Sequence, residues 1–213
     1  MKTIAIIPAR GGSKGLPRKN IKLLRGKPLI SYPIKAAQES GIIDHIFVTT
    51  DDKEIAAIAR ESGADVPFLR PPEMAQDTTT MEETMKQALS QYEEHSEIKF
   101  DICIFLTATD IFRKPTWITE AVQILIDRPD IESAFAGHTT FKNYWEQLPE
   151  GGFQRVRPYM QIYGQRQERI RNKRVIYRED TGLACASRSW LWREGRRIGD
   201  KVEIIANNDT STD

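Results

Sequence analysis

Short apolar runs alternate with amphipathic segments along most of the 213 residues, and this alternation restricts the fold more than any other feature. Strand-like runs occupy residues 3–8, 45–50, 66–69, 101–107, 132–137, 182–187 and 201–205. Several of them, such as residues 102–106, are apolar at every position, which is typical of strands covered on both faces. Segments with helical spacing occupy residues 28–40, 52–62, 81–94 and 115–128. This order predicts an α/β fold, a three-layer α/β/α arrangement with a mainly parallel, Rossmann-like sheet.

Two of the expected helices carry recognisable start signals. Thr80 precedes a segment whose third residue is Glu83, which predicts a capping box. Asp51 comes before the segment at residues 52–62 and has Glu54 three positions later. We therefore interpret Asp51 as a helix cap in preference to a catalytic group.

The composition is that of an ordinary globular protein and narrows the range of functions. The formal net charge is +1, so attraction of the whole chain to nucleic acid or to a membrane surface is not indicated. No apolar run approaches the roughly 20 residues that span a bilayer. Cys103 and Cys185 lie in apolar, strand-like runs, which favours buried, reduced thiols in a cytoplasmic protein over a disulfide. No cysteine–histidine cluster has the spacing of zinc ligands.

The length suits one α/β domain, so we predict a single domain over residues 1–213. Residues 138–178 interrupt the alternation of strands and helices. Aromatic residues are interleaved there with basic ones, and residues 154–178 hold eight Lys or Arg but one acid, Glu168. We interpret residues 138–178 as an inserted arm or subdomain, because a separate folding domain is disfavoured at this size.

A glycine-rich, basic loop follows the first strand-like run. Residues 8–20 read Pro-Ala-Arg-Gly-Gly-Ser-Lys-Gly-Leu-Pro-Arg-Lys-Asn, and nine Lys or Arg precede the first acid, Glu39. Glycines let backbone N–H groups approach a phosphate and basic side chains supply charge, so the loop predicts a nucleoside triphosphate site. Neither a Walker A motif nor the Gly-x-Gly-x-x-Gly dinucleotide fingerprint is present. The alternative is a solvated basic turn, but a plain turn needs neither the glycines nor the charges.

Residues 4–30 resemble the opening of the CMP-sugar synthetases, the cytidylyltransferases that activate sialic acid and related 3-deoxy-2-ulosonic acids. Similar segments follow in order at residues 48–52, 68–78 and 209–213. The similarity covers nearly the whole chain, and its amino-terminal motif is the most specific part. It implies a fold of the nucleotide-diphospho-sugar transferase type with an inserted dimerisation arm, and therefore a homodimer.

The resemblance implies that CTP reacts with a sugar acid to give a CMP-sugar and pyrophosphate, with the anomeric hydroxyl attacking the α-phosphorus. It implies nucleotide contacts from Arg10, Gly11, Gly12, Ser13, Lys14, Lys19, Asn20, Arg70 and Thr79. Among these, Arg10, Lys14 and Lys19 are expected to act in catalysis by neutralising charge on the phosphate oxygens. Arg70 and Thr79 fall where the family contacts cytosine. Such a transfer needs positioning and charge neutralisation, and no Ser/His/Asp constellation is required.

Residues 106–113 occupy the place of the family's Gln-Pro-Thr-Ser-Pro-Leu-Arg segment, where the sugar binds. By this similarity, Thr107, Thr109 and Arg113 are expected to bind the substrate. Thr107 replaces the glutamine, which removes a two-sided hydrogen-bonding group and leaves the identity of the sugar acid open. Asp110 replaces the serine, and its carboxylate either helps to bind magnesium or caps the turn before Pro115.

A basic run at residues 166–178 falls where the family has an arm that crosses to a second subunit. Runs of this kind usually form a solvated face. By the resemblance, Arg166 and Lys173 are candidates to contact the sugar carboxylate or a phosphate in the partner's site.

The end of the sequence bears on the expected cofactor, Mg²⁺. The family has two carboxylates two residues apart that bind this ion, and this chain stops at Asp213, the first of them. We therefore expect Asp213 to be a metal ligand, with the site completed by Asp110 or by residues of a longer chain. The expectation is weak turnover by these 213 residues, restored when the missing tail is added.

The leading interpretation is a CTP- and Mg²⁺-dependent cytidylyltransferase that acts on a nonulosonic, sialic-acid-like or related ulosonic acid for cell-surface glycoconjugates. A sugar-1-phosphate nucleotidyltransferase of the same architecture is disfavoured by the amino-terminal motif. The missing glutamine and the missing second aspartate support a third alternative, a non-catalytic nucleotide-binding relative. Nucleic-acid binding through residues 155–178 is disfavoured by the nearly neutral net charge. The expected partners are CTP and a sugar acid, with no nucleic acid and no membrane.

Overall fold

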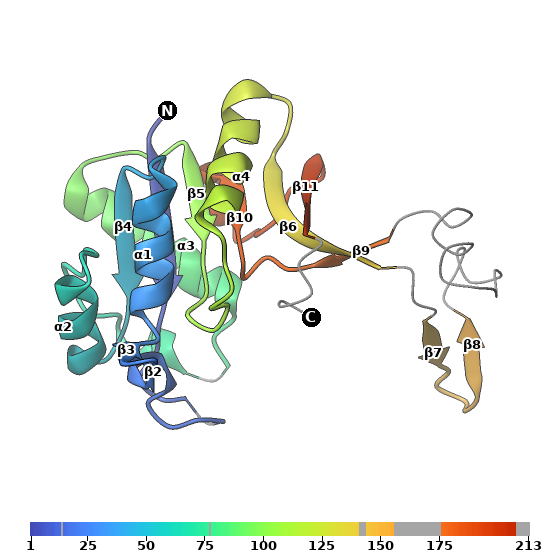
Figure 1. Ribbon diagram of the computed structural model, residues 1–213, viewed down its shortest axis with the longest axis horizontal. Coiled ribbons are helices and arrows are strands. Elements are labelled where there is room, and N and C mark those ends of the chain that lie inside the picture. Colours follow the sequence, from blue (N-terminus) through green and yellow to red (C-terminus); the bar gives the residue numbers. More distant parts are fainter. Residues whose placement is uncertain (14, 77, 141–143, 156–175, 208–213) are drawn as a thin grey trace.

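The computed structural model describes residues 1–13, 15–76, 78–140, 144–155 and 176–207, and within them a seven-stranded sheet forms the centre of the molecule (Figure 1). Its strands are β1 (Thr3–Pro8), β4 (His45–Thr49), β5 (Ile102–Phe105), β6 (Ser133–Thr140), β9 (Ile176–Glu179), β10 (Cys185–Arg188) and β11 (Val202–Asn207). The order is β11-β6-β10-β5-β1-β4, and β9 pairs with β6. Within this sheet β9 and β10 run antiparallel to their neighbours and the other pairs are parallel, which confirms a mainly parallel sheet.

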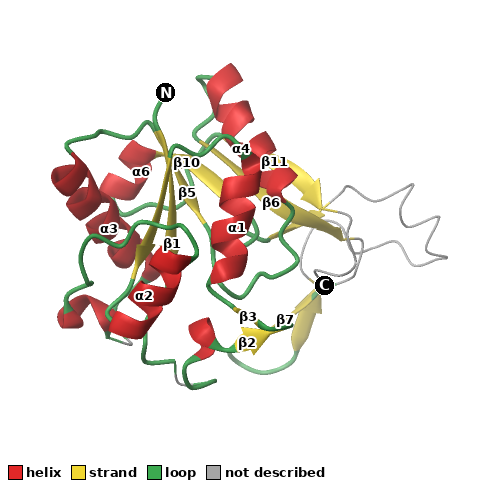
Figure 2. Ribbon diagram, turned by 60° about the vertical axis from the view of Figure 1, so that its left-hand side comes forward, coloured by secondary structure: helices red, strands yellow, loops and turns green. Residues whose placement is uncertain are grey.

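Helices cover both faces of the sheet (Figure 2). The described helices are α1 (Ser31–Ser40), α2 (Lys53–Glu61), α3 (Met81–Ser96), α4 (Pro115–Asp127) and α6 (Ser189–Arg193). The apolar sides of α1, α2 and α4 share one core with the sheet, and those of α3 and α6 share another. The three-layer α/β/α prediction is therefore confirmed.

The apolar runs in the sequence follow from this double covering. In β1, Ala5 and Ile7 belong to the core beneath α1 and α4, whereas Ile4 and Ile6 belong to the core beneath α3. All four side chains are fully buried. Since successive residues of a strand point to opposite faces, a central strand covered on both sides must be apolar at every position.

Most expected strands and helices form within a few residues of their predicted ends, but residues 66–69 do not form a strand. Asp65 makes a single bridge to Phe47, and Pro67 then removes a backbone donor, so the pairing stops. Conversely, β9 was not predicted, because its alternation is short and half of its residues are charged.

The parallel strands β1, β4 and β5 end at the same edge of the sheet, which brings together loops that are far apart in the sequence. The Ala9 N–H donates to the Thr49 carbonyl at 3.0 Å, beyond the end of β1. The Thr107 N–H donates to the carbonyl of Gly182, just before β10, at 3.3 Å. The glycine-rich loop, the turn after β4 and the turn after β5 therefore meet at this carboxyl edge.

Two carboxylates at the turn after β4 have separate tasks. Asp52 is the cap of α2, and its Oδ1 accepts the N–H groups of Glu54 at 2.8 Å and Ile55 at 3.0 Å. The interpretation of Asp51 as the cap is therefore wrong by one residue. Asp51 Oδ1 instead accepts the Gly11 N–H at 2.9 Å, so this carboxylate holds the glycine-rich loop. The predicted capping box of Thr80 and Glu83 at the start of α3 is confirmed.

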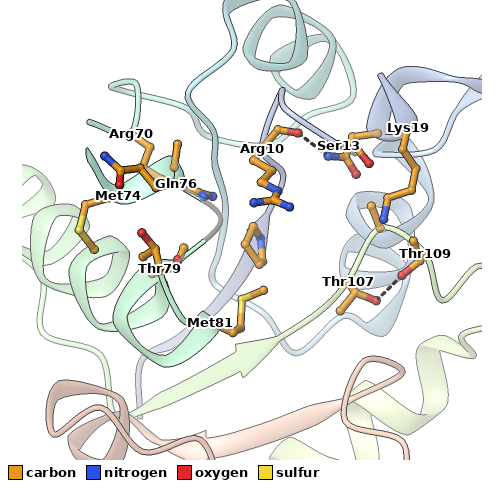
Figure 3. Close-up of a pocket in the computed structure, with 15 residues that line it drawn as sticks. Arg10, Ser13, Lys19, Arg70, Met74, Gln76, Thr79, Met81, Thr107 and Thr109 are labelled. Atoms are coloured by element: carbon orange, nitrogen blue, oxygen red, sulfur yellow. Dashed lines mark hydrogen bonds between the residues drawn. The ribbon is translucent and has the colours of Figure 1, made fainter. Parts of the chain in front are cut away.

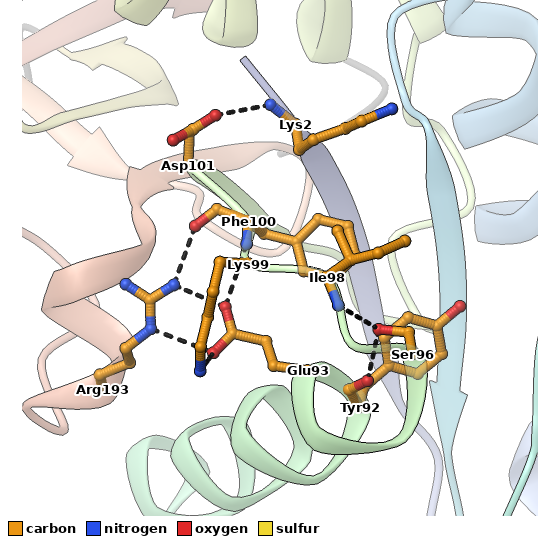
Figure 4. A network of polar contacts seen from close by, with 9 residues as sticks. All are labelled: Lys2, Tyr92, Glu93, Ser96, Ile98, Lys99, Phe100, Asp101 and Arg193. Atoms are coloured by element: carbon orange, nitrogen blue, oxygen red, sulfur yellow. Dashed lines mark hydrogen bonds and ion pairs between the residues drawn. The ribbon is translucent and has the colours of Figure 1, made fainter.

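A buried carboxylate on α3 joins three elements at the amino edge of the sheet (Figure 4). The fully buried side chain of Glu93 accepts hydrogen bonds from Arg193 of α6, from Lys99 and from the Phe100 N–H. Burial raises the pKa of Glu93, but these three donors and the Arg193 charge hold the pKa below its ordinary value.

Several short elements lie outside the main sheet. Strands β2 (Leu23–Leu24) and β3 (Lys27–Pro28) form a hairpin after a 3₁₀ turn at Lys19–Ile21, and a second 3₁₀ turn spans Pro72–Ala75. Strands β7 (Trp145–Gln147) and β8 (Phe153–Arg155) pair in a hairpin that stands apart from the main sheet, beyond the end of β6 (Figure 1). Cys103 and Cys185 are buried, free thiols, as predicted. Among the described residues, no helix combines the length and apolarity needed to cross a bilayer.

Candidate functional site

A cavity of about 400 Å³ opens at the carboxyl edge of the sheet. Three parts of the chain line it: the end of β1 with the glycine-rich loop (residues 9–20), the segment from Arg70 into the start of α3, and the turn after β5. In α/β proteins this edge is where ligands bind, because loops from several strands converge there.

Eight of the residues predicted from the sequence as nucleotide or substrate contacts line this cavity. They are Arg10, Ser13, Lys19, Asn20, Arg70, Thr79, Thr107 and Thr109. Figure 3 shows Arg70 and Thr79 on one side and Lys19, Thr107 and Thr109 on the other, with the Arg10 side chain between them. The structure therefore brings the predicted nucleotide side and the predicted sugar side into one space.

The lining of the cavity is positively charged. Arg10, Lys19 and Arg70 contribute three cations, and none of the described lining residues is Asp or Glu. Because these side chains face one partly enclosed space, an anion there meets their summed field with less screening than in open water. The charge pattern suits a ligand with several negative charges, such as a triphosphate.

Arg70 is held rigidly in the cavity wall. It is 5% exposed, and its guanidinium donates to the Thr49 carbonyl at 2.6 Å and to the Thr49 hydroxyl at 3.1 Å. Burial lowers its pKa to about 10, against the opposing effect of Asp51 and with a small further lowering by Arg10. The side chain stays charged at neutral pH and is fixed before any ligand arrives.

Asn20 connects the two ends of the glycine-rich loop. Its side-chain amide donates to the Arg10 backbone carbonyl at 2.9 Å, and the backbone carbonyl of Asn20 accepts the Ile30 N–H at 2.8 Å. Asn20 is 6% exposed and also lines the cavity. Its amide therefore holds the backbone that carries Arg10 as well as facing the ligand space.

Other predicted residues lie elsewhere. Gly11 and Gly12 belong to the loop but do not line the cavity, and the Gly11 N–H is already bonded to Asp51. Lys14, Arg166, Lys173 and Asp213 lie outside the described residues.

Arg113 does not face this cavity, although it was predicted to bind the sugar. Its guanidinium donates to the backbone carbonyls of Thr107, Gly182 and Leu183, and it is 8% exposed. Burial lowers its pKa to about 10, opposed by Asp110. Arg113 thus ties the turn after β5 to the segment just before β10, a task that suits the fork of donors on a guanidinium.

Asp110 is also absent from the lining of the cavity beside the glycine-rich loop. Its carboxylate accepts a hydrogen bond from the Thr107 hydroxyl, and it lines a second cavity of about 390 Å³ beside α1 together with Arg113. A Cβ atom at position 182 would collide with Asp110 Oδ2, so a side chain there would have to displace this carboxylate. This arrangement favours the alternative that Asp110 stabilises the turn.

Seven of the described lining residues were not predicted from the sequence as contacts, and five of them belong to the segment that leads from Arg70 into α3: Met74, Ala75, Gln76, Met81 and Thr84. They reach the cavity because the segment after β4 passes through a 3₁₀ turn and enters α3 beside the glycine-rich loop. The sequence did hold a signal for these contacts. The capping box at the start of α3 lies next to residues 68–78, which resemble the family, so the first turn of α3 must face the same edge of the sheet.

The described residues do not form a metal site by themselves. None of their side chains make a group of three or more His, Cys, Asp or Glu that could hold an ion. No carboxylate lines the cavity in the described part of the chain. The described residues therefore supply no carboxylate ligand for Mg²⁺ at this cavity.

Comparison with known proteins agrees with this geometry. The sequence model of the family described as Cytidylyltransferase matches residues 4–146. A CMP-N,N'-diacetyllegionaminic acid synthase from Legionella pneumophila is 44% identical over 124 residues, which are 58% of this chain and 53% of that protein. An N-acylneuraminate cytidylyltransferase from Escherichia coli is 45% identical over 123 residues, 58% of this chain and 28% of that protein. The chain thus matches about half, or less, of the length of these relatives.

The fold has solved counterparts. A CMP:2-keto-3-deoxy-manno-octonic acid synthetase complexed with CTP superposes with a TM-score of 0.64 over 97% of this chain and 91% of that one, at 18% identity. At this identity the likeness establishes the architecture alone. With the family model matching two thirds of its length, the chain belongs to the cytidylyltransferase family.

Proposed function

We propose that this chain transfers CMP from CTP to a nonulosonic acid of the sialic-acid type or a related ulosonic acid, releasing pyrophosphate. In this reaction the anomeric hydroxyl oxygen of the sugar forms a bond to the α-phosphorus, and the bond from that phosphorus to the β-phosphate oxygen breaks. The hydroxyl proton is lost and pyrophosphate carries away the electron pair of the broken bond. The family assignment and the names of the relatives support the proposal.

The observation that carries the proposal is the cavity itself, which combines three cations with no acid among its described lining residues. In the proposed complex, Arg10 and Lys19 neutralise phosphate oxygens and Arg70 forms the wall on the base side. Because Arg70 is already fixed by Thr49, little reorganisation is needed when CTP binds.

The sugar acid is assigned to the side of the cavity formed by Thr107 and Thr109. Their hydroxyls are 3.4 Å apart, and both line the cavity. Short hydroxyls leave more room than the glutamine found in similar enzymes and offer fewer hydrogen bonds. We therefore propose that the substrate is recognised there by shape and single hydroxyl contacts, with its carboxylate bound by basic groups.

We propose Mg²⁺ as the cofactor, on the basis of the triphosphate chemistry. Since the described residues supply no carboxylate to the cavity, the ion would rely on phosphate oxygens, water and residues beyond the described part, of which Asp213 is the expected one. Lys14 joins Arg10 and Lys19 in this proposal as a phosphate contact.

We also propose a homodimer and a cytoplasmic location. The hairpin of β7 and β8 carries Trp145, which is 53% exposed, and stands apart from the main sheet. A large exposed aromatic residue on a projecting hairpin is typical of an interface. The buried, free thiols of Cys103 and Cys185 suit a reducing compartment.

Pyrophosphate release tests the proposed reaction. The protein is incubated with CTP, Mg²⁺ and a panel of nonulosonic and ulosonic acids, with ATP, GTP or UTP replacing CTP in parallel. We expect release with CTP and at least one acid, and its loss when EDTA is added. CTP binding without release from any acid would instead support a non-catalytic relative, and release with a sugar 1-phosphate would support the other nucleotidyltransferase class.

A further inference from the structure

The glycine-rich loop is attached to the turn after β4 at its beginning. The Gly11 N–H donates to Asp51 Oδ1 at 2.9 Å, and two residues earlier the Ala9 N–H donates to the Thr49 carbonyl at 3.0 Å. Asp51 is half-buried, so this bond is partly shielded from water. The loop therefore leaves β1 in a direction that the carboxylate of Asp51 fixes.

The far end of the loop is attached to the same turn. Arg18 Nη1 lies 3.0 Å from Asp52 Oδ2, and its other terminal nitrogen pairs with Glu54. Arg18 has a φ of 55°, a left-handed conformation that is unfavourable for a residue with a side chain. The pair of consecutive acids thus holds both ends of the loop, and Asp52 is also occupied as the cap of α2.

Close packing against this turn explains why glycine stands at position 11. A Cβ atom there would lie 2.8 Å from Asp52 Oδ2 and 3.0 Å from Asp52 Cβ. By contrast, a Cβ atom at Gly12 would meet nothing within 4 Å. The loop therefore packs directly against the turn of Asp51 and Asp52 at Gly11, whereas the space around Gly12 is open.

The backbone donors of the loop are divided accordingly. The Gly11 N–H is used by Asp51, and the Ser13 N–H donates to the Gly11 carbonyl at 3.0 Å. Among the described residues, the Gly12 N–H has no hydrogen-bond partner. The bond from Gly11 to Asp51 therefore leaves the Gly12 N–H in the open part of the loop. The backbone held at Gly11 also carries the preceding residue, Arg10, into the cavity.

The charge of Asp51 also acts on the cations that line the cavity. Asp51 raises the pKa of Arg70, whereas burial and the charge of Arg10 lower it. A carboxylate at this position offsets part of the repulsion between cations when no nucleotide is bound, and it does not line the cavity itself.

We propose that Asp51 is a positioning residue for CTP, because its hydrogen bond to the Gly11 N–H sets the shape of the glycine-rich loop before the triphosphate binds. This inference rests on the proposed function of the cavity. Asp51 touches neither substrate in this proposal and acts through the backbone of Gly11 and the placement of Arg10.

The protein offers a matched control at the opposite end of the same strand. Asp44 accepts the Thr3 N–H at 2.8 Å, a carboxylate-to-backbone bond like that of Asp51, but at the amino end of β1. Asp44→Ala therefore removes a similar bond away from the cavity. Asp51→Ala removes the bond at Gly11, and Asp51→Asn removes the charge but keeps an oxygen that can accept the Gly11 N–H.

Two measurements on the full chain test the proposal. Amide hydrogen exchange at Gly11 is followed without nucleotide, so its result stands whether or not the parent binds CTP. We expect exchange to be about tenfold faster or more in Asp51→Ala, and unchanged in Asp44→Ala. Calorimetric titration with CTP is expected to give a Kd about tenfold higher in Asp51→Ala, within about twofold of the parent in Asp51→Asn, and unchanged in Asp44→Ala.

Unchanged exchange at Gly11 in Asp51→Ala would overturn the proposal, as would an unchanged affinity for CTP. An Asp51→Asn protein that binds CTP as weakly as Asp51→Ala would also overturn it, because charge and not the hydrogen bond would then be responsible. A parent that does not bind CTP while Asp51→Ala alters exchange would refute the proposed function but leave the attachment of the loop established. If Asp51→Ala fails to fold, Asp51→Asn decides alone: exchange at Gly11 and a Kd for CTP within about twofold of the parent would support the hydrogen bond, and a Kd about tenfold higher would overturn it.

Discussion

At the scale of single residues, arginines in similar motifs have unlike tasks. Arg10 extends into the cavity, whereas Arg113 is buried and donates to three backbone carbonyls. Both stand after a parallel strand in matched segments, so the sequence predicted ligand contacts for both. Arg113 differs because the backbone carbonyls of Gly182 and Leu183 lie within reach of its guanidinium. These carbonyls lie there because β10 pairs with β5, a contact between residues far apart in the sequence.

Glu93 gives a prediction about stability and pH. Its folded-state pKa is depressed, so the carboxylate stabilises the fold above the ordinary glutamate pKa of about 4.3, and this stabilisation is lost as pH falls through the folded-state value. Glu93→Gln should cost about 2–3 kcal/mol at neutral pH and should flatten the loss of stability below about pH 5. Urea denaturation at several pH values measures both effects. The exposed neighbour Glu94→Gln is the control, and equal pH profiles for Glu93→Gln and the parent would contradict the prediction.

Gly182 gives a prediction about the turn after β5. Gly182→Ala would drive a methyl group into Asp110 Oδ2, so the Thr107–Asp110 hydrogen bond must break or the turn must shift. We expect a loss of about 1–3 kcal/mol in the free energy of unfolding. In an Asp110→Ala background the same substitution should cost less than about 1 kcal/mol, because the obstructing group is gone. Equal costs in both backgrounds, measured by denaturant unfolding, would show that Asp110 is not the obstacle.

At the scale of elements, local sequence signals predicted where helices begin, but not always which residue caps the helix. The capping box at Thr80 was predicted correctly because two side chains three residues apart define it. At α2, Asp51 and Asp52 are both suitable caps, and the choice of Asp52 leaves Asp51 for Gly11. A cap signal with two adjacent acids cannot be resolved without the neighbouring loop.

The start of α3 can be tested directly. Thr80→Ala removes the side-chain acceptor for the Glu83 N–H and one half of the capping box. We expect a loss of about 1 kcal/mol in the free energy of unfolding. Thr78→Ala, two residues earlier and exposed, should change it by no more than about 0.5 kcal/mol. Thermal or urea unfolding measures the difference, and a Thr80→Ala protein as stable as the parent would rule out this role of the cap.

At the scale of the whole molecule, the sequence predicted the three layers and the mainly parallel sheet, and the meeting of the loops at one edge is a consequence of them. These features follow from local periodicity and from the rule that parallel strands end on the same side. The sequence did not predict the pairing of β9 with β6, nor that Thr107 and Asp110, whose side chains are hydrogen-bonded, line two different cavities. Such features depend on contacts between residues far apart in the chain, and no local pattern encodes them.

The proposed homodimer makes a prediction about the mass in solution. Light scattering after size exclusion should give about twice the chain mass of 24.4 kDa. Trp145→Lys, which places a charge on the exposed hairpin of β7 and β8, should shift the mass toward that of one chain. Trp190→Lys, at an exposed position of α6, serves as the control. A parent that elutes with the mass of one chain at every concentration would contradict the homodimer.

Binding of CTP in the cavity is tested most directly by isothermal titration of the nucleotide into the parent, Lys19→Ala and Lys22→Ala. Lys19 lines the cavity, whereas Lys22 lies three residues later, is exposed and does not line it. Since a hydrogen bond to a charged group contributes about 1.5–3 kcal/mol, Lys19→Ala should raise the Kd about tenfold or more and Lys22→Ala by less than about twofold. A parent that binds no CTP, or a Lys19→Ala protein that binds it as tightly as the parent, would contradict the assignment of the cavity to CTP.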